Sequence, residues 1–128
     1  MQQEPRVRRV AIADDSPAFL SAAASYVTTL PGFQLAGTAR TAPQTIDLVE
    51  NSMPDVLLLD LRLAPKRGEL VRRVKSTPAA PAVVALTLFN TPEAAAAAKL
   101  AGADELVGKE SFISGLALAL ARLFPSAA

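Results

Sequence analysis

VLLLDLRLAPKRGEL, residues Val56–Leu70, joins four consecutive apolar residues to an aspartate, Asp60, and then to a loop with proline, glycine and basic residues. An apolar run of this length is typical of a strand that is buried on both faces of a parallel sheet. An ionised carboxylate at the end of such a strand has to be solvated, paired with a cation or bound to a metal. The stretch therefore predicts a central strand that presents Asp60 at one edge of a sheet.

Strand-like segments alternate with helical patterns along the whole chain. The predicted strands are Arg9–Ala13, Phe33–Ala39, Val56–Leu59, Ala82–Thr87 and Asp104–Val107. Strands that alternate with helices indicate an α/β fold, in which helices cover both faces of a parallel sheet. We therefore expect a doubly wound, five-stranded parallel sheet built from five βα units.

The helix ends carry clear signals. Ser16, Thr41 and Thr91 are hydroxyl residues followed within two positions by proline, a pattern that marks helix N-termini. Gly102 is a plausible end of the fourth helix, and the last helix is expected to begin near Ser111. The last helix is predicted to bury an apolar stripe made of Phe112, Ile113, Leu116, Leu120, Leu123 and Phe124.

The composition excludes several classes of protein. The 128 residues include no cysteine and no histidine, which excludes disulfides, thiolate metal sites and imidazole catalysis. Thirteen basic and 12 acidic residues leave a net charge of +1, so no direct nucleic-acid binding is expected. No apolar segment approaches the about 20 residues of a membrane span, and no signal peptide is evident. A cytoplasmic protein without a membrane partner is expected.

Polar residues stand where four of the predicted strands end. Asp14 and Asp15 follow the first strand, Asp60 the third, Thr87 closes the fourth and Lys109 follows the fifth. Because the carboxyl ends of parallel strands meet at one edge, these side chains are expected to lie together. Three nearby carboxylates repel, so either one stays protonated or a hard cation takes up the charge. An all-oxygen site of this kind suits Mg²⁺ or Mn²⁺.

The pattern resembles the receiver domain of bacterial two-component response regulators. The stretches that match in order and spacing are DDS (14–16), PDVLLLDL (54–61), LT (86–87) and GADELVGK (102–109). The match runs from about Val7 to Phe124. It implies the flavodoxin-like, CheY-like fold with strand order 2-1-3-4-5. A single receiver domain over residues 1–128, with a core of about 7–124 and no output domain in this chain, is expected.

The resemblance also implies a metal site. Asp60 is the phosphoacceptor in such a domain, and Asp14 and Asp15 hold a Mg²⁺ or Mn²⁺ ion together with it, directly or through water. Arg62 contributes its backbone carbonyl to the same ion. The implied donor of the phosphoryl group is a histidine of a partner sensor kinase or phosphotransfer protein.

Two further residues complete the implied site. Lys109 and Thr87 contact the phosphoryl group, and the hydroxyl of Thr87 turns toward it after transfer. In receivers this movement changes a surface formed by the fourth helix, the fifth strand and the fifth helix. That surface is sparsely charged here and includes Leu118, so we expect it to bind a second copy of the chain or a downstream protein.

The chain departs from the family pattern at several positions. Ala64 and Pro65 shift the usual proline of the loop after the phosphoacceptor by one residue. Leu88 follows Thr87 where a small residue is usual, and Leu106 replaces the aromatic residue that usually takes part in switching. KES (109–111) lacks the common Lys-Pro pair, as in receivers of helix-turn-helix transcriptional regulators.

Other functions remain as alternatives. Leu106 and the altered loop suggest a degenerate receiver that acts as a phosphorylation-independent interaction or dimerisation module, but the retained Asp60 and Lys109 argue against it. An aspartyl-phosphate phosphatase needs two aspartates separated by one residue, whereas Asp14 and Asp15 are adjacent. The acidic ADDSPAF (13–19) would repel a flavin phosphate. No enzyme activity is expected beyond self-phosphorylation from a phosphodonor and autodephosphorylation.

Overall fold

The computed structural model describes residues 6–63 and 66–125, so the predicted loop change at Ala64 and Pro65 lies outside the described residues. Five parallel strands form one sheet in the order β2-β1-β3-β4-β5. They are β1 (Arg8–Ala13), β2 (Phe33–Ala39), β3 (Val56–Asp60), β4 (Ala82–Thr87) and β5 (Glu105–Gly108). The predicted doubly wound, flavodoxin-like topology is confirmed, and each strand end lies within one residue of its expected place.

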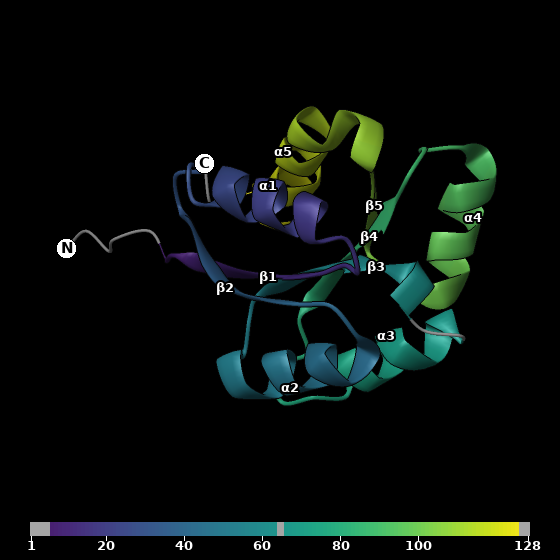
Figure 1. The fold of residues 1–128 in the computed structure, drawn as a ribbon, viewed down its shortest axis with the longest axis horizontal. Coiled ribbons are helices and arrows are strands. Elements are labelled where there is room, and N and C mark those ends of the chain that lie inside the picture. Colours follow the sequence, from purple (N-terminus) through teal and green to yellow (C-terminus); the bar gives the residue numbers. More distant parts are fainter. Residues whose placement is uncertain (1–5, 64–65, 126–128) are drawn as a thin grey trace.

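Five α-helices cover the sheet. They are α1 (Pro17–Val27), α2 (Ala42–Ser52), α3 (Arg67–Lys75), α4 (Pro92–Ala101) and α5 (Phe112–Leu123). Helices α1 and α5 lie on one face, and α2, α3 and α4 contribute to the core on the other (Figure 1). Short 3₁₀ turns, Leu61–Leu63 and Lys109–Ser111, follow β3 and β5.

Strand β3 is the centre of the core. All five of its residues are buried. Leu57 and Leu59 pack with residues of α2, α3 and α4, whereas Val56 and Leu58 pack with residues of α1 and α5. This alternation follows from the two-residue period of a strand, and apolar side chains on both faces match the apolar sequence. Asp60 is therefore held at the end of the most tightly enclosed strand.

The helix caps form as the sequence predicts. The hydroxyl oxygens of Ser16, Thr41 and Thr91 each accept a hydrogen bond from the backbone N–H three residues later, at 3.1 to 3.2 Å. Gly102 ends α4 with a φ of 95°, a left-handed conformation that glycine adopts without a steric penalty. The three caps fix where α1, α2 and α4 begin and thereby the length of the loops that lead into them.

One prediction for the last helix is wrong. Ile113 is 63% exposed, whereas the sequence-based stripe placed it in the core. Ile113 lies only about 20° around the helix axis from the buried Leu120, seven residues later, so its exposure follows from its place in the first turn of α5 and not from the direction of its helix face. The fully buried positions of α5 are Leu116, Ala119 and Leu120. The apolar stripe therefore continues through a small residue, Ala119, that hydrophobicity alone did not single out.

Two leucines of α5 give a matched test of this packing. Leu116 is fully buried and Leu118 is 57% exposed. Leu116→Ala should lower the free energy of unfolding by about 2 to 5 kcal/mol, because it leaves a cavity in a close-packed core. Leu118→Ala should change it by less than about 0.5 kcal/mol. Urea denaturation of the two variants measures both values, and equal losses would contradict the orientation of α5.

Candidate functional site

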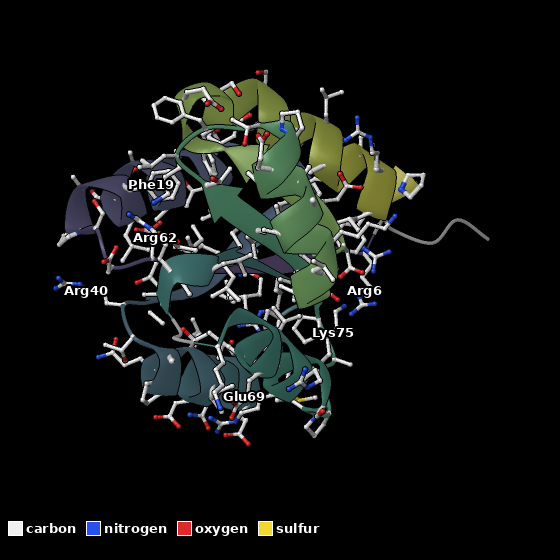
Figure 2. All side chains as sticks on the ribbon, turned by 90° about the vertical axis from the view of Figure 1, so that its right-hand side faces the viewer. Arg6, Phe19, Arg40, Arg62, Glu69 and Lys75 are labelled. Carbon is white, nitrogen blue, oxygen red and sulfur yellow. The ribbon has the colours of Figure 1, made fainter. Side chains whose placement is uncertain are left out.

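The candidate site lies at the carboxyl edge of the sheet. Asp60 and Thr87 are the last residues of β3 and β4, and Asp14 and Lys109 directly follow β1 and β5. The parallel register pairs Asp60 with the residue before Thr87, which places the two strand ends side by side. In Figure 2 Arg62 lies on the left, at the carboxyl edge of the sheet, whereas Arg6 and Lys75 lie on the right.

Three carboxylates converge at this edge. Asp14, Asp15 and Asp60 each place one oxygen within 4.8 Å of the others. Asp14 and Asp60 are buried, at 0% and 1% exposure, whereas the side chain of Asp15 is 64% exposed. Two buried anions this close need a compensating positive charge, because burial removes the water that would otherwise screen them.

Lys109 supplies part of that charge from the 3₁₀ turn that follows β5. Its Nζ lies 2.6 Å from Asp14 Oδ2 and 3.2 Å from Asp60 Oδ2, and its side chain is only 11% exposed. The ammonium also lies 4.7 Å from the centre of the Phe19 ring, which packs edge-on against Phe112. Lys109 therefore lies between two of the three carboxylates, and its contact with a phosphoryl group stays a prediction.

Phe19 is a contributor that sequence reasoning missed. The helical spacing assigned it to the apolar stripe of the first helix, and it does pack partly against the core. Its ring also forms one wall beside the ammonium of Lys109, where a cation and an aromatic face attract. The available signal was its position in the first turn of α1, four residues after Asp15.

Arg62 contributes its side chain as well as its backbone. Its backbone N–H donates to Asp60 Oδ1 at 2.9 Å. Its Nε lies 3.2 and 3.1 Å from the two oxygens of Asp60, and its Nη2 donates to Asp60 Oδ2 at 2.8 Å. The same Nη2 lies 3.8 Å from Asp15 Oδ1. The sequence implied only a backbone carbonyl ligand here, and that role stays a prediction.

These contacts decide the ionisation of Asp60. Burial raises the pKa of the Asp60 carboxyl, but hydrogen bonds from Arg62 and the charge of Lys109 outweigh this effect. The resulting pKa lies below the ordinary value of an aspartate. The hydrogen bond to Asp60 likewise raises the pKa of Arg62. At neutral pH Asp60 is thus a carboxylate, the form in which it can act as a nucleophile.

The acidic cluster fits a divalent cation. Asp14 Oδ1 accepts a hydrogen bond from the backbone of Ser16, but the buried Oδ2 finds no hydrogen-bond donor within residues 6–63 and 66–125. The charge partner of this oxygen is the ammonium of Lys109, 2.6 Å away. Three carboxylates that each place one oxygen within 4.8 Å of the others are a donor set that suits Mg²⁺ or Mn²⁺.

Thr87 borders the same space as Asp60. A cavity of about 170 Å³ is lined by both residues, together with Leu88 and Leu106. The hydroxyl of Thr87 donates a hydrogen bond of 3.3 Å to the carbonyl of Phe89, in the loop after β4. Thr87 is therefore close to the carboxylate edge while its hydroxyl holds the loop that leads into α4.

Comparison with protein families agrees with this geometry. The family model described as the response regulator receiver domain matches residues 10–121. The chain belongs to the response regulator receiver family. This receiver domain has the CheY-like fold of that family, and receiver domains partner with histidine kinases or phosphotransfer domains in two-component systems.

A curated relative adds context to the receiver. It is protein-glutamate methylesterase/protein-glutamine glutaminase 5 of Myxococcus xanthus, 35% identical over 118 residues, which are 91% of this chain and 32% of that protein. The receiver thus spans about a third of the length of this relative. The activity in the name of that relative is therefore not carried over to this receiver.

Solved structures share the fold of the receiver. A two-component response regulator of the LuxR family from Aurantimonas sp. superposes with a TM-score of 0.81 at 23% identity, covering 93% of this chain and 86% of that one. A structure of the P1 domain of CheA3 in complex with CheY6 from R. sphaeroides gives a TM-score of 0.80 at 25% identity, covering 94% and 99%. Within the described residues of the receiver, no helix has the length and apolar character needed to cross a membrane.

The lowered pKa of Asp60 predicts a pH dependence of stability. A carboxylate whose pKa is lower in the folded than in the unfolded chain stabilises the fold above the unfolded value, and this stabilisation disappears as the pH falls through the folded value. The free energy of unfolding should therefore fall with acidification below the ordinary value of 3.8. The decline should be shallower in Asp60→Asn, which lacks the titrating group.

Urea denaturation over a series of acidic pH values measures these two curves. Asp47→Asn, at an exposed position of α2, controls for the loss of one carboxylate from the total charge. Parallel curves for wild type and Asp60→Asn would show that Arg62 and Lys109 do not favour the ionised form of Asp60.

Proposed function

We propose that this receiver domain accepts a phosphoryl group on Asp60 from a phosphohistidine of a partner protein and passes the signal to a protein-interaction surface. The observation that carries the proposal is the ionised Asp60 carboxylate, which is buried within 3.2 Å of the Lys109 ammonium and beside Asp14 and Asp15. A nucleophile, a buried cation and an oxygen-rich metal site in one place are the parts that phosphoryl transfer to a carboxylate requires.

The chemical step is a displacement at phosphorus. An oxygen of Asp60 forms the new P–O bond, the P–N bond to the donor imidazole breaks, and its electron pair remains on the imidazole nitrogen. Two anions must approach each other in this step, so positive charge around the transferred oxygens is essential. Lys109 is already placed at Asp60 Oδ2 to supply it. A Mg²⁺ ion held by Asp14, Asp15 and Asp60 supplies the remaining charge when it is bound.

The proposed signal begins at Thr87. Its hydroxyl now donates to the Phe89 carbonyl, and a phosphoryl group on Asp60 offers three stronger, charged acceptors across the shared cavity. Transfer of this hydrogen bond releases the loop between β4 and α4. Leu106 lines the same cavity in place of an aromatic residue, so the change is passed on through the loop and α4 rather than by rotation of a ring.

A phosphorylation-independent interaction module is the second candidate function. The specific observation in its favour is that the Arg62 side chain already occupies both oxygens of Asp60, as a permanent counter-ion would. Such a module keeps the fold and its surfaces but accepts no phosphoryl group. The two candidates differ in one measurable property, the reactivity of Asp60.

Asp60→Asn should abolish modification by a small phosphodonor. Wild type incubated with acetyl phosphate and Mg²⁺ should gain one phosphoryl group by intact mass, and a chelator should prevent the gain, because the reaction needs the carboxylate and the divalent ion. Asp104→Asn is the matched control, since Asp104 pairs with Lys75 away from the site and its loss should leave labelling unchanged. Equal labelling of Asp60→Asn and wild type, or labelling in the presence of chelator, would favour the second candidate.

The output surface is proposed to consist of α4, β5 and α5. It carries two strongly exposed leucines, Leu100 at 89% and Leu118 at 57%. Helix α4 has few charged side chains, since its sequence is PEAAAAAKLA. Exposed apolar side chains on a sparsely charged face favour contact with another protein surface. We include a second copy of the chain as the first partner to test.

Leu118→Glu should prevent phosphorylation-dependent self-association. Light scattering over a concentration series should show a larger species with beryllofluoride and Mg²⁺, and the introduced charge should abolish it, because a buried unpaired carboxylate opposes the contact. Met53→Glu is the control, since Met53 is similarly exposed at 54% but follows α2. A monomer in every condition would leave a different protein as the partner, and a dimer unaffected by Leu118→Glu would place the contact elsewhere.

A further inference from the structure

The two oxygens of Asp60 are fully occupied by donors. Oδ1 accepts from the Arg62 backbone N–H at 2.9 Å and from Nε at 3.2 Å. Oδ2 accepts from Nε at 3.1 Å and Nη2 at 2.8 Å of the same arginine, and from Lys109 Nζ at 3.2 Å. A carboxylate offers about four lone-pair positions. Four donor groups therefore use its whole accepting capacity, and the Arg62 side chain supplies two of them.

A metal ion and a phosphorus atom need the same lone pairs. Coordination of a cation by Asp60 uses one oxygen, and attack on phosphorus uses the other. Neither oxygen has a free position while the Arg62 guanidinium spans both. Arginine holds a carboxylate with a planar fork of donors, a geometry that is stronger and more specific than a single ion pair.

The charge of the cluster points to an exchange of cations. Asp14, Asp15 and Asp60 bring three negative charges, and Lys109 and Arg62 bring two positive ones, so one net negative charge remains. With the guanidinium removed, two negative charges remain, which a divalent ion neutralises. The arginine and the metal are thus alternative partners for the same anions.

Lys109 and Arg62 differ in how easily their side chains can move away from the carboxylates. Lys109 is 11% exposed and lies against the Phe19 ring, so it stays with Asp14 and Asp60. The Arg62 side chain is 53% exposed and extends from a 3₁₀ turn of three residues. Figure 2 shows Arg62 at the surface of the site edge, below Phe19. Water can therefore replace the bonds of its guanidinium when it turns outward.

We propose that the Arg62 side chain is a built-in competitor of the divalent cation, which masks Asp60 until the metal displaces it. This inference rests on the proposed function, because it concerns access to the same phosphoacceptor. Its consequence is that metal binding and unmasking of the nucleophile are one event. Asp60 then reacts only in the metal-bound form, and the affinity for the ion is lower than the three carboxylates alone would provide.

Metal binding without any phosphodonor tests the proposal. Titration calorimetry with Mg²⁺, repeated with Mn²⁺, should show about tenfold tighter binding to Arg62→Ala than to wild type, because a competing charge-assisted bond is removed. Arg62→Met keeps much of the apolar stem and should bind as tightly as Arg62→Ala. The backbone carbonyl of residue 62 is present in all three proteins.

Arg40→Ala provides the matched control. Arg40 is an exposed arginine near the same edge, and its guanidinium donates to the backbone carbonyl of Asp15 at 3.5 Å. Among the residues that the structure describes, it forms no ion pair with a carboxylate of the site. Arg40→Ala should bind Mg²⁺ with wild-type affinity. A gain as large as that of Arg62→Ala would mean that general charge is responsible, and would overturn the proposal.

A second measurement uses the wild-type protein and no variant of the site. The Nε–Hε resonance of Arg62 should be sharp in metal-free protein, since this group is bonded to Asp60, and it should move and broaden as Mg²⁺ is added. An unchanged resonance at saturating Mg²⁺ would overturn the proposal.

The outcomes separate this proposal from the proposed function. Equal Mg²⁺ affinity of wild type and Arg62→Ala, with Asp60 still labelled in a Mg²⁺-dependent reaction, would overturn the masking role alone. Absence of Mg²⁺ binding in every variant, with no labelling of Asp60, would overturn both. Tighter binding to Arg62→Ala together with displacement of the Arg62 resonance would establish the exchange.

Discussion

The burial of two carboxylates at the end of the sheet is the constraint on which the site depends. Asp14 and Asp60 are withdrawn from water, and an uncompensated buried charge costs several kcal/mol. The Lys109 ammonium lies 2.6 Å from Asp14 and 3.2 Å from Asp60, and it extends from the turn after β5, the strand beyond β4 in the sheet. The strand order 2-1-3-4-5 is what brings these three residues to one edge, so the topology and the electrostatics of the site are inseparable.

The two cations do not fully balance the charge of the three carboxylates, although both oxygens of Asp60 accept hydrogen bonds. Three carboxylates face two cations, which leaves the cluster ready to attract a further positive ion. The buried Lys109 and the exposed Arg62 differ in what their release requires, so they suit different tasks. A buried cation gives permanent support to the anions, whereas an exposed one is exchangeable.

Short side chains connect the site to its proposed output surface. Ala94 and Ala97 of α4, with Leu106 of β5, line the cavity that also borders Asp60 and Thr87. Larger residues at these positions would fill that space and hold the loop after β4 in one arrangement. The alanine-rich α4 is therefore more than a good helix former. It leaves room beside Thr87 for the proposed change of the loop after β4.

The sequence alone determined the strands, the caps at Ser16, Thr41 and Thr91, and the convergence of the polar residues, because periodicity, capping and parallel order are local or topological rules. It did not predict the fork of Arg62 on Asp60 or the Phe19 wall beside Lys109, and it placed Ile113 wrongly in the core. Only the tertiary structure decided these, since they depend on the direction in which each side chain leaves its turn and on which distant segment meets it there.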